Sequence, residues 1–311
     1  MTVLGSRKVG RYEAYSLRDA SGWGIEVLPE FGARLNGLWL RDGPLCLNVI
    51  DGLDGEDEPH KSRPYYNVLL FPFVNRLASG RYSHGQRSYR FPINEPARDN
   101  ALHGFLFDVP FRIVHARADA DEVSLALSHD YAGDRVHYPF PFLIDVTYRV
   151  RRRRFTLELI LRNTGPDAAP VAVGWHPYFT LGCPVDALRL KAPTAERIEV
   201  DEKRLLPTGG VQADVAFVAG RQIGREHLDS CFVLSRDAPP MIRMESPEAC
   251  LSVIPAESLG YLQLFTPPHR RSLAVEPMSA NIDALNNGAG LMVLPSGARF
   301  STSVEVSLDR I

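Results

Sequence analysis

The dominant pattern along the chain is a strict alternation of apolar and polar residues. It is clearest over residues 142–150, FLIDVTYRV, where every second residue is apolar. Residues 122–128, 155–163 and 300–308 repeat it. Alternation with a period of two is typical of antiparallel strands that bury one face. Turn-forming sequences separate these runs, among them RDG, SGR, NTGPD, PTGG and NNG.

Helical patterns are scarce, and Glu226–Asp229 is predicted to form at most a single helical turn. No Gly/Ser-rich or Pro-rich linker divides the chain, the polar stretch 50–63 is short, and no internal repeat is present. Many short strands without an interdomain break predict an all-β fold, a large antiparallel β-sandwich. We expect residues 1–311 to form one domain.

Composition narrows the class of partner. Apolar residues make up 45% of the chain and charged residues 23%, with a net charge of -2. This balance gives no global field toward nucleic acid or an anionic membrane. The basic run Arg151–Arg154 lies between two alternating stretches, which favours a solvated hairpin turn over a nucleic-acid site.

The N-terminal residues and the cysteines bear on localisation. The first residues lack the apolar core of a signal peptide, and no apolar run is long enough to cross a bilayer. The cysteines at 46, 183, 231 and 250 are far apart and form no CxxC pair. We therefore expect a cytoplasmic protein with reduced thiols and without a metal centre.

The stretch GWHPYFTL, residues 174–181, contains the first candidate for chemistry, His176. A histidine among aromatic residues is often a core residue whose ring nitrogens are both hydrogen-bonded. Alternatively, aromatic walls hold the imidazole against a small ligand so that it can donate a proton. We expect Trp175 and Tyr178 to restrict its ring and Pro177 to fix the backbone after it.

A second candidate, Glu276, follows the apolar strand Leu273–Val275 and precedes Pro277. Alternation places Ala274 and Glu276 on the same side of that strand. Such a carboxylate is either exposed at the start of a loop or aimed into a groove as a positioned base.

Two further stretches place polar residues at the ends of apolar runs. Asn75 and Arg76 directly follow residues 68–74, and together they offer fixed donors suited to several hydroxyl groups. Arg76 could equally be a surface cation. His103 precedes Gly104, which allows a ligand or a loop to approach closely. His103 could equally be structural.

Taken in order, FPFVNRLASGRY, NALHGF, GWHPYF and AVEPMS resemble the aldose 1-epimerase (galactose mutarotase) family. The resemblance runs from Trp23 to Leu308, and YPFPFLIDVTYRV, LDSCF and LQLFTPP support it. It implies a galactose mutarotase-like β-sandwich with a sugar on the concave face of a curved sheet. It also implies an isomerase of carbohydrate metabolism that interconverts the α and β anomers of a free aldose.

The resemblance assigns roles by position. His176 matches the family's general acid and Glu276 its general base, and these two groups can open and close a hemiacetal without a metal or other cofactor. The remaining matches are sugar-binding or wall positions: Arg76, His103, Asp229, Asn75, Tyr178, Phe179 and, on a neighbouring strand, Gln263.

Departures from the family pattern leave the sugar open. Thr180 stands where an Asn is common, Phe105 follows Gly104 where a second Gly is common, and the last loop reads MSANIDALNN. One alternative is a hexose-6-phosphate 1-epimerase, for which Arg81, Arg87 and Arg90 would form a phosphate clamp, although a Trp-Pro-Trp type motif is absent.

A second alternative is a sugar-binding domain of the same fold that does no chemistry. A glycoside hydrolase needs two carboxylates flanking the bond, and only Glu276 has such a setting. The sequence is compatible with a monomer or a homodimer that binds a small sugar.

Overall fold

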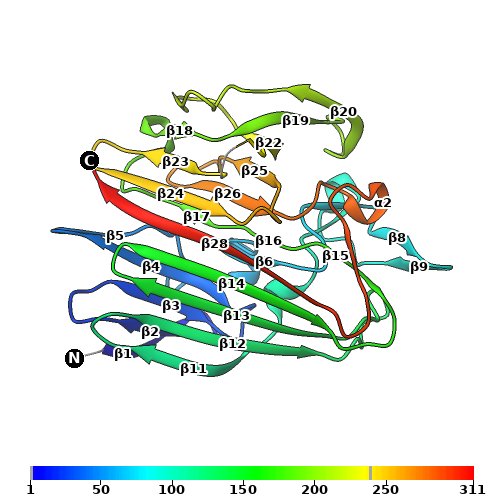
Figure 1. Cartoon of the computed structure of the whole chain (residues 1–311), viewed down its shortest axis with the longest axis horizontal. Coiled ribbons are helices and arrows are strands. Elements are labelled where there is room, and N and C mark those ends of the chain that lie inside the picture. The colour runs from blue at the N-terminus through cyan, green and yellow to red at the C-terminus, as the bar shows by residue number, and fades with distance from the viewer. Residues whose placement is uncertain (1–2, 238–239) are drawn as a thin grey trace.

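The computed structural model describes residues 3–237 and 240–311, and strands make up most of it (Figure 1). Its largest sheet has nine strands in the order β11-β12-β13-β14-β28-β24-β23-β18-β21. Their bounds are Arg112–Ala118, Val123–Tyr131, Phe142–Arg151, Arg154–Asn163, Arg299–Arg310, Ala249–Pro255, Ile242–Glu245, Arg189–Lys191 and Arg221–Gln222. Every neighbouring pair is antiparallel.

A second sheet of eight strands has the order β20-β19-β22-β25-β26-β16-β6, with β17 also paired to β26. These strands are β20 (Pro207–Ala213), β19 (Thr194–Val200), β22 (Asp229–Leu234), β25 (Tyr261–Phe265), β26 (Leu273–Met278), β16 (Gly174–Trp175), β6 (Leu69–Leu70) and β17 (Tyr178–Phe179). The two sheets are the layers of the predicted all-β sandwich.

Smaller elements complete the fold. A five-stranded N-terminal sheet contains β1 (Val3–Val9), β2 (Tyr12–Arg18), β3 (Gly24–Leu28), β4 (Arg34–Asp42) and β5 (Leu45–Asn48). Three strand pairs join β7 (Arg76–Ala78) to β10 (Asn100–Leu102), β8 (Arg81–His84) to β9 (Arg87–Arg90), and β15 (Ala169–Val171) to β27 (Met292–Leu294). The α-helices α1 (Pro59–Ser62) and α2 (Ala284–Asn287) are short. No helix in the described part of the chain has the length and apolar character that a bilayer crossing requires.

The alternating stretches form the strands that the pattern predicts. In β13, each apolar position from Phe142 to Val150 is buried and the residues between them are partly exposed. The hairpin at 151–154 is also confirmed: Arg151 pairs with Arg154, and these arginines are exposed. Arg152 takes the positive φ of 54° that the tight turn needs.

The predicted helical turn at 226–229 is wrong. Asp229 begins β22, and the preceding backbone hydrogen-bonds to the neighbouring strand segment instead of to itself. The amide of Thr266 donates to the carbonyl of Leu228 at 2.9 Å, and the Leu228 amide donates to the Thr266 hydroxyl at 2.9 Å. These bonds satisfy the backbone groups that a helical turn would have used.

The main core lies between the two large sheets. Phe155 of β14 packs against Trp175 of β16 with ring centroids 5.9 Å apart, and both side chains are buried. Leu273 and Val275 of β26 belong to the same core. Because side chains alternate along a strand, Ala274 and Glu276 point to the opposite face of the eight-stranded sheet. That face carries the candidate site.

Candidate active site

Glu276 lies within β26, one residue beyond the predicted strand Leu273–Val275. Its strand neighbour in β25 is Gln263, whose own neighbour in β22 is Cys231. The Glu276 side chain is only 2% exposed, so the alternative of a carboxylate on a solvated loop is wrong. The sheet therefore holds this carboxylate on a rigid backbone, aimed away from the core.

His176 sits in the short connection between β16 and β17, both of which pair with β26. Its amide donates to the carbonyl of Val68 at 2.9 Å, and its carbonyl accepts from the amide of Asn67 at 2.9 Å. This pairing brings the imidazole Nε2 to within 3.3 Å of Glu276 Oε1. Two residues a hundred positions apart in the chain thus form one buried pair.

Two aromatic rings fix the plane of the imidazole. Tyr178 stacks on His176 with centroids 5.0 Å apart and an interplanar angle of 10°, and His103 meets it edge-on at 5.1 Å. Tyr66 also stacks on Tyr178, with ring centroids 3.7 Å apart. The Tyr66 hydroxyl lies 2.7 Å from His269 Nε2, which anchors the outer end of the stack.

Trp175 and Phe179 do not take part in this frame, and the predicted roles for them are wrong. Both side chains point into the core, where their rings meet edge-on at 5.7 Å. The reason is the alternation of side chains along the chain: His176 and Tyr178 face the site, so their neighbours 175 and 179 face the other way.

A chain of amide hydrogen bonds crosses the floor of the site. Asn75 Nδ2 donates to Gln263 Oε1 at 3.1 Å, and Gln263 Nε2 donates to Asp229 Oδ1 at 2.8 Å. Asn75 and Gln263 are buried, whereas the Asp229 side chain is 40% exposed. Because each amide is fixed by its partner, the atoms offered to a ligand have defined donor and acceptor roles.

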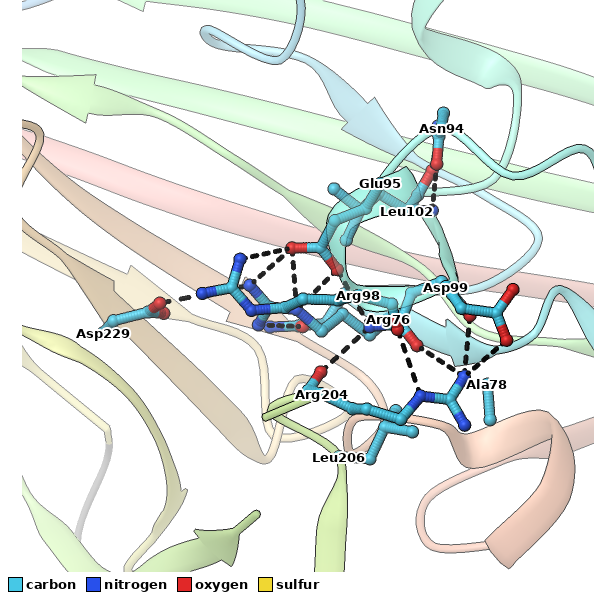
Figure 2. A network of polar contacts seen from close by, with 12 residues as sticks. Arg76, Ala78, Asn94, Glu95, Arg98, Asp99, Leu102, Arg204, Leu206 and Asp229 are labelled. Atoms are coloured by element: carbon cyan, nitrogen blue, oxygen red, sulfur yellow. Dashed lines mark hydrogen bonds and ion pairs between the residues drawn. The ribbon is translucent and has the colours of Figure 1, made fainter. Parts of the chain in front are cut away.

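Arg76 is held between two carboxylates (Figure 2). Its Nε donates to Glu95 Oε2 at 3.1 Å and its Nη2 donates to Glu95 Oε1 at 3.2 Å, while Nη2 lies 4.0 Å from Asp229 Oδ2. The side chain is 11% exposed, so Arg76 is not a surface cation. Sequence reasoning missed Glu95, because no local sequence pattern links this carboxylate to Arg76, which lies on a strand 19 residues earlier.

Asn75 and His103 both have left-handed backbone, with φ of 53° and 64°. The His103 amide donates to the Asn75 carbonyl at 2.9 Å, which locks the two turns together. Gly104, with φ of 70°, forms a bridge to Phe71, and a methyl group on Gly104 would collide with the Phe71 carbonyl. The predicted close approach at this glycine is therefore confirmed, with a chain segment as the neighbour.

Burial dominates the electrostatics of the pair. It lowers the pKa of His176 to about 3, with a further lowering from Arg34 that a backbone hydrogen bond opposes. It raises the pKa of Glu276 well above its ordinary value; Asp229 adds to that shift and Arg76 opposes it. Burial also lowers the pKa of His103, and His176 and Arg76 add to the effect. Each of these groups is therefore driven toward its neutral form.

Three buried polar atoms at the site have no hydrogen-bond partner in the described structure: Nδ1 of His176, Nδ1 of His103 and Oε2 of Glu276. Buried polar groups in native proteins are almost always paired. Three unpaired polar atoms therefore lie together in one cluster around His176 and Glu276.

These side chains line one cavity of about 230 Å³, which we call the central pocket. Every residue with a predicted catalytic or substrate-binding role, Phe179 excepted, lies in it: His176, Glu276, Asn75, Arg76, His103, Asp229, Tyr178 and Gln263. Its other lining residues are Tyr65, Leu102 and Phe265. Phe265 was missed although it stands two residues after Gln263 on a strand, which puts both on the same face.

The arginines of the phosphate-clamp alternative are elsewhere. Arg81, Arg87 and Arg90 belong to the β8–β9 hairpin and do not line the central pocket. Within residues 3–237 and 240–311, no group of three or more His, Cys, Asp or Glu side chains could hold a metal ion.

The family model described as aldose 1-epimerase matches residues 13–307. The chain belongs to the aldose 1-epimerase family. It is 30% identical over 249 residues to the uncharacterized protein YihR of Escherichia coli (strain K12), covering 77% of this chain and 79% of that protein.

Solved structures of this fold agree. A galactose mutarotase-like protein from Clostridium acetobutylicum has a TM-score of 0.87 at 18% identity, over 100% of this chain and 99% of the other. A galactose 1-epimerase from Lactobacillus acidophilus NCFM has a TM-score of 0.82 at 18% identity, with the same coverage. The galactose mutarotase-like fold implied by the sequence motifs is thus confirmed.

One further feature of this aldose 1-epimerase family member supports the pocket wall from behind. Arg34 is fully buried and lies 4.3 Å over the ring of Phe31. It donates to the carbonyl of Arg63 at 3.1 Å and also to the carbonyl of Pro64. Pro64 directly precedes Tyr65, so Arg34 fixes the segment that supplies this wall residue.

Proposed function

We propose that the protein is an aldose 1-epimerase that interconverts the α and β anomers of a free aldose, with Glu276 as general base and His176 as general acid. The observation that carries the proposal is the buried His176–Glu276 pair, 3.3 Å apart, at the floor of a pocket lined by sugar-compatible donors and acceptors. Family membership supports a carbohydrate epimerase.

The reaction needs one proton taken and one given at oxygens bonded to the same carbon. Glu276 removes the proton from the C1 hydroxyl, the electrons of that O–H bond form the C1 carbonyl, and the bond from C1 to the ring oxygen breaks. His176 delivers its proton to the departing ring oxygen. Rotation about the C1–C2 bond exposes the other carbonyl face, and ring closure reverses both transfers. Glu276 and His176 lie next to each other, which suits proton transfer at the C1 hydroxyl oxygen and the ring oxygen, since both are bonded to C1.

The electrostatics add a detail to this cycle. Opening the ring consumes a carboxylate and an imidazolium, whereas burial drives both Glu276 and His176 toward their neutral forms. In the neutral pair Glu276 is protonated and His176 is not, so the pair holds one transferable proton, as the ionised pair does. The neutral pair is the state that exists after ring opening, together with the open-chain aldehyde. Binding of a cyclic sugar therefore requires that proton to pass from Glu276 to His176, and hydrogen bonds from the sugar to the carboxylate favour this transfer.

The other residues position the ring. Asn75, Gln263 and Asp229 form a fixed hydrogen-bonded row, and Arg76 is oriented by Glu95. Such a row can hold several hydroxyls at once, which keeps C1 against the acid and base and lowers the entropic part of the barrier.

The central pocket does not favour a phosphorylated substrate. Among its lining residues the only Lys or Arg is Arg76, and that guanidinium already binds Glu95. A binding domain without chemistry would have no need for a buried acid–base pair 3.3 Å apart.

Polarimetry tests the proposal directly. Freshly dissolved α-D-glucose and α-D-galactose are followed with wild-type protein and with Glu276→Gln, and a wider sugar panel is followed by anomer-exchange NMR. We expect wild type to accelerate at least one exchange and Glu276→Gln to lose about two to four orders of magnitude in kcat. Saturable binding without acceleration for any sugar would refute the proposal in favour of a binding protein.

A further inference from the structure

A second cavity, of about 440 Å³, opens beside the central pocket. We call it the side cavity. The two share Arg76, Asp229 and Gln263 as lining residues, so they meet along the row that we assign to sugar hydroxyls. The far wall of the side cavity comes from β19, from the turn after it and from Thr208 at the start of β20.

The sizes of the two cavities indicate a substrate longer than one ring. The central pocket, at about 230 Å³, lies below the roughly 300–1,000 Å³ that pockets for larger ligands occupy. The side cavity is the larger of the two. A molecule that filled both would have one ring at the acid–base pair and a second unit across Asp229 and Arg76.

The direction of entry follows from the chemistry. C1 and the ring oxygen must face Glu276 and His176, and the C1 hydroxyl must be free for the ring to open. The shared residues Arg76 and Asp229 therefore face the other side of the ring, where the non-anomeric hydroxyls lie. A second unit that reaches the side cavity is joined through one of those hydroxyls, and the molecule keeps its reducing end.

The lining of the side cavity suits a neutral polyhydroxylated unit. Its arginines are occupied: Arg76 binds Glu95, and Arg197 donates to Gln212 at 2.6 Å and lies 3.6 Å from Asp214. Its carboxylates Glu199 and Glu202 are exposed, and no side-chain hydrogen bond or ion pair engages them in the described residues. Free carboxylates accept hydrogen bonds from hydroxyls and repel an anionic group.

Apolar residues provide the rest of the lining. Ile198 and Ile282 are buried and Leu205 is half-buried. Such side chains can contact the C–H face of a sugar ring, as apolar walls do in pockets with a few oriented polar groups.

The wall that carries Glu202 and Leu205 is tied to the network that holds Arg76 (Figure 2). Arg204 Nε donates to the Arg98 carbonyl at 3.0 Å, and its Nη2 donates to the Asp99 carbonyl at 2.7 Å. Asn100 Nδ2 returns a bond of 2.9 Å to the Arg204 carbonyl and another of 2.9 Å to Glu95. The same hydrogen bonds therefore position Arg76 and the far wall, as a site for one continuous ligand requires.

We propose that the physiological substrate is a reducing oligosaccharide, whose reducing-end ring is epimerised in the central pocket while its second sugar ring occupies the side cavity. This inference rests on the proposed function for the reaction at C1. It adds a second sugar subsite and a substrate class to that function.

The test compares anomer exchange by NMR for glucose and galactose with that of 3-, 4- and 6-linked reducing disaccharides: laminaribiose, maltose, cellobiose, lactose and melibiose. Thr208 lines the side cavity and not the central pocket, so Thr208→Trp is chosen to obstruct the side cavity alone. Val215→Trp is the matched control, because Val215 is 66% exposed and lines neither cavity.

We expect at least one disaccharide to exceed both monosaccharides in kcat/KM by about tenfold, the gain that one or two additional hydrogen bonds supply. Thr208→Trp should abolish that gain and leave monosaccharide exchange within about twofold of wild type, and Val215→Trp should change neither. If monosaccharides are turned over and no disaccharide is better, the inference is overturned and the proposed function stands.

Absence of exchange for every sugar would defeat the proposed function, and binding then decides the inference separately. Calorimetric titration of Glu276→Gln with the same sugars would support the subsite if a disaccharide binds about tenfold more tightly than a monosaccharide and Thr208→Trp removes the difference. Equal binding of both classes would overturn it.

Discussion

Replacing Glu276 by Gln is expected to abolish activity and, above about pH 5, to stabilise the fold. The carboxyl group is 2% exposed and its Oε2 has no hydrogen-bond partner among the described residues, so ionisation inside the folded protein is unfavourable. Glutamine keeps the size of the side chain and cannot ionise. The substitution therefore removes an electrostatic penalty while leaving the packing in place.

The sign and size follow from proton linkage. The pKa of Glu276 is raised in the folded state, so its contribution to stability is fully present below the unfolded pKa of about 4.3 and is lost as pH rises toward the folded value. Over that window wild type loses about 1.4 kcal/mol per pH unit through this group, and the variant does not. Between pH 5 and 7 the advantage of the variant should grow by up to about 3 kcal/mol.

Urea unfolding of both proteins at pH 5, 6, 7 and 8 measures this difference, with equal m-values as the check that unfolding is comparable. His176, whose pKa is lowered, gives stability that is lost as pH falls from about 6.5 toward 3. A stability difference that stays constant across the series would show that Glu276 has an ordinary pKa, and the reasoning from burial would be refuted.

Three other substitutions test separate parts of the site. His176→Asn should lower kcat by about two to four orders of magnitude with the fold intact by circular dichroism, and near-normal turnover would remove it from the mechanism. Arg76→Lys cannot bind Glu95 through two nitrogens, so KM should rise by about tenfold with kcat little changed in steady-state kinetics; a loss confined to kcat would contradict a binding role. Arg34→Ala removes the side-chain donor to the part-buried carbonyls of Arg63 and Pro64 and should lower the free energy of unfolding by about 2 kcal/mol in urea titration, whereas a change below about 1 kcal/mol would show that Arg34 does not hold the wall segment.

Much of the fold could be predicted from the sequence because one face of most strands is buried and the other is not. The period of two over residues 142–150 and 155–163 gave strands that the structure confirms as β13 and β14. The same parity placed Glu276 on the face away from the core. When the same alternation is extended through residues 175–179, it points Trp175 and Phe179 into the core, where the structure places them. The prediction that these two rings help to surround His176 did not follow this alternation, and it was wrong.

The rest of the site depends on contacts between distant segments. Local patterning contains no signal that Glu95 binds Arg76, that Arg34 fixes the segment before Tyr65, or that Tyr66 extends the stack on Tyr178. Each of these depends on how loops pack across a finished sheet. The gathering of the predicted polar residues into one pocket was foreseen from the family resemblance, and composition or periodicity could not have supplied it.

The left-handed turns at Asn75 and His103 have a consequence for how this enzyme family diversifies. His176 and Glu276 sit where β26 is hydrogen-bonded to β16 and β17, whereas Asn75 and His103 sit on turns joined to each other by one backbone bond. Substitution or lengthening of the loops around those turns can reshape the rim of the central pocket without moving His176 and Glu276. The rim can therefore vary in sequence and length while the sheet that holds His176 and Glu276 stays the same.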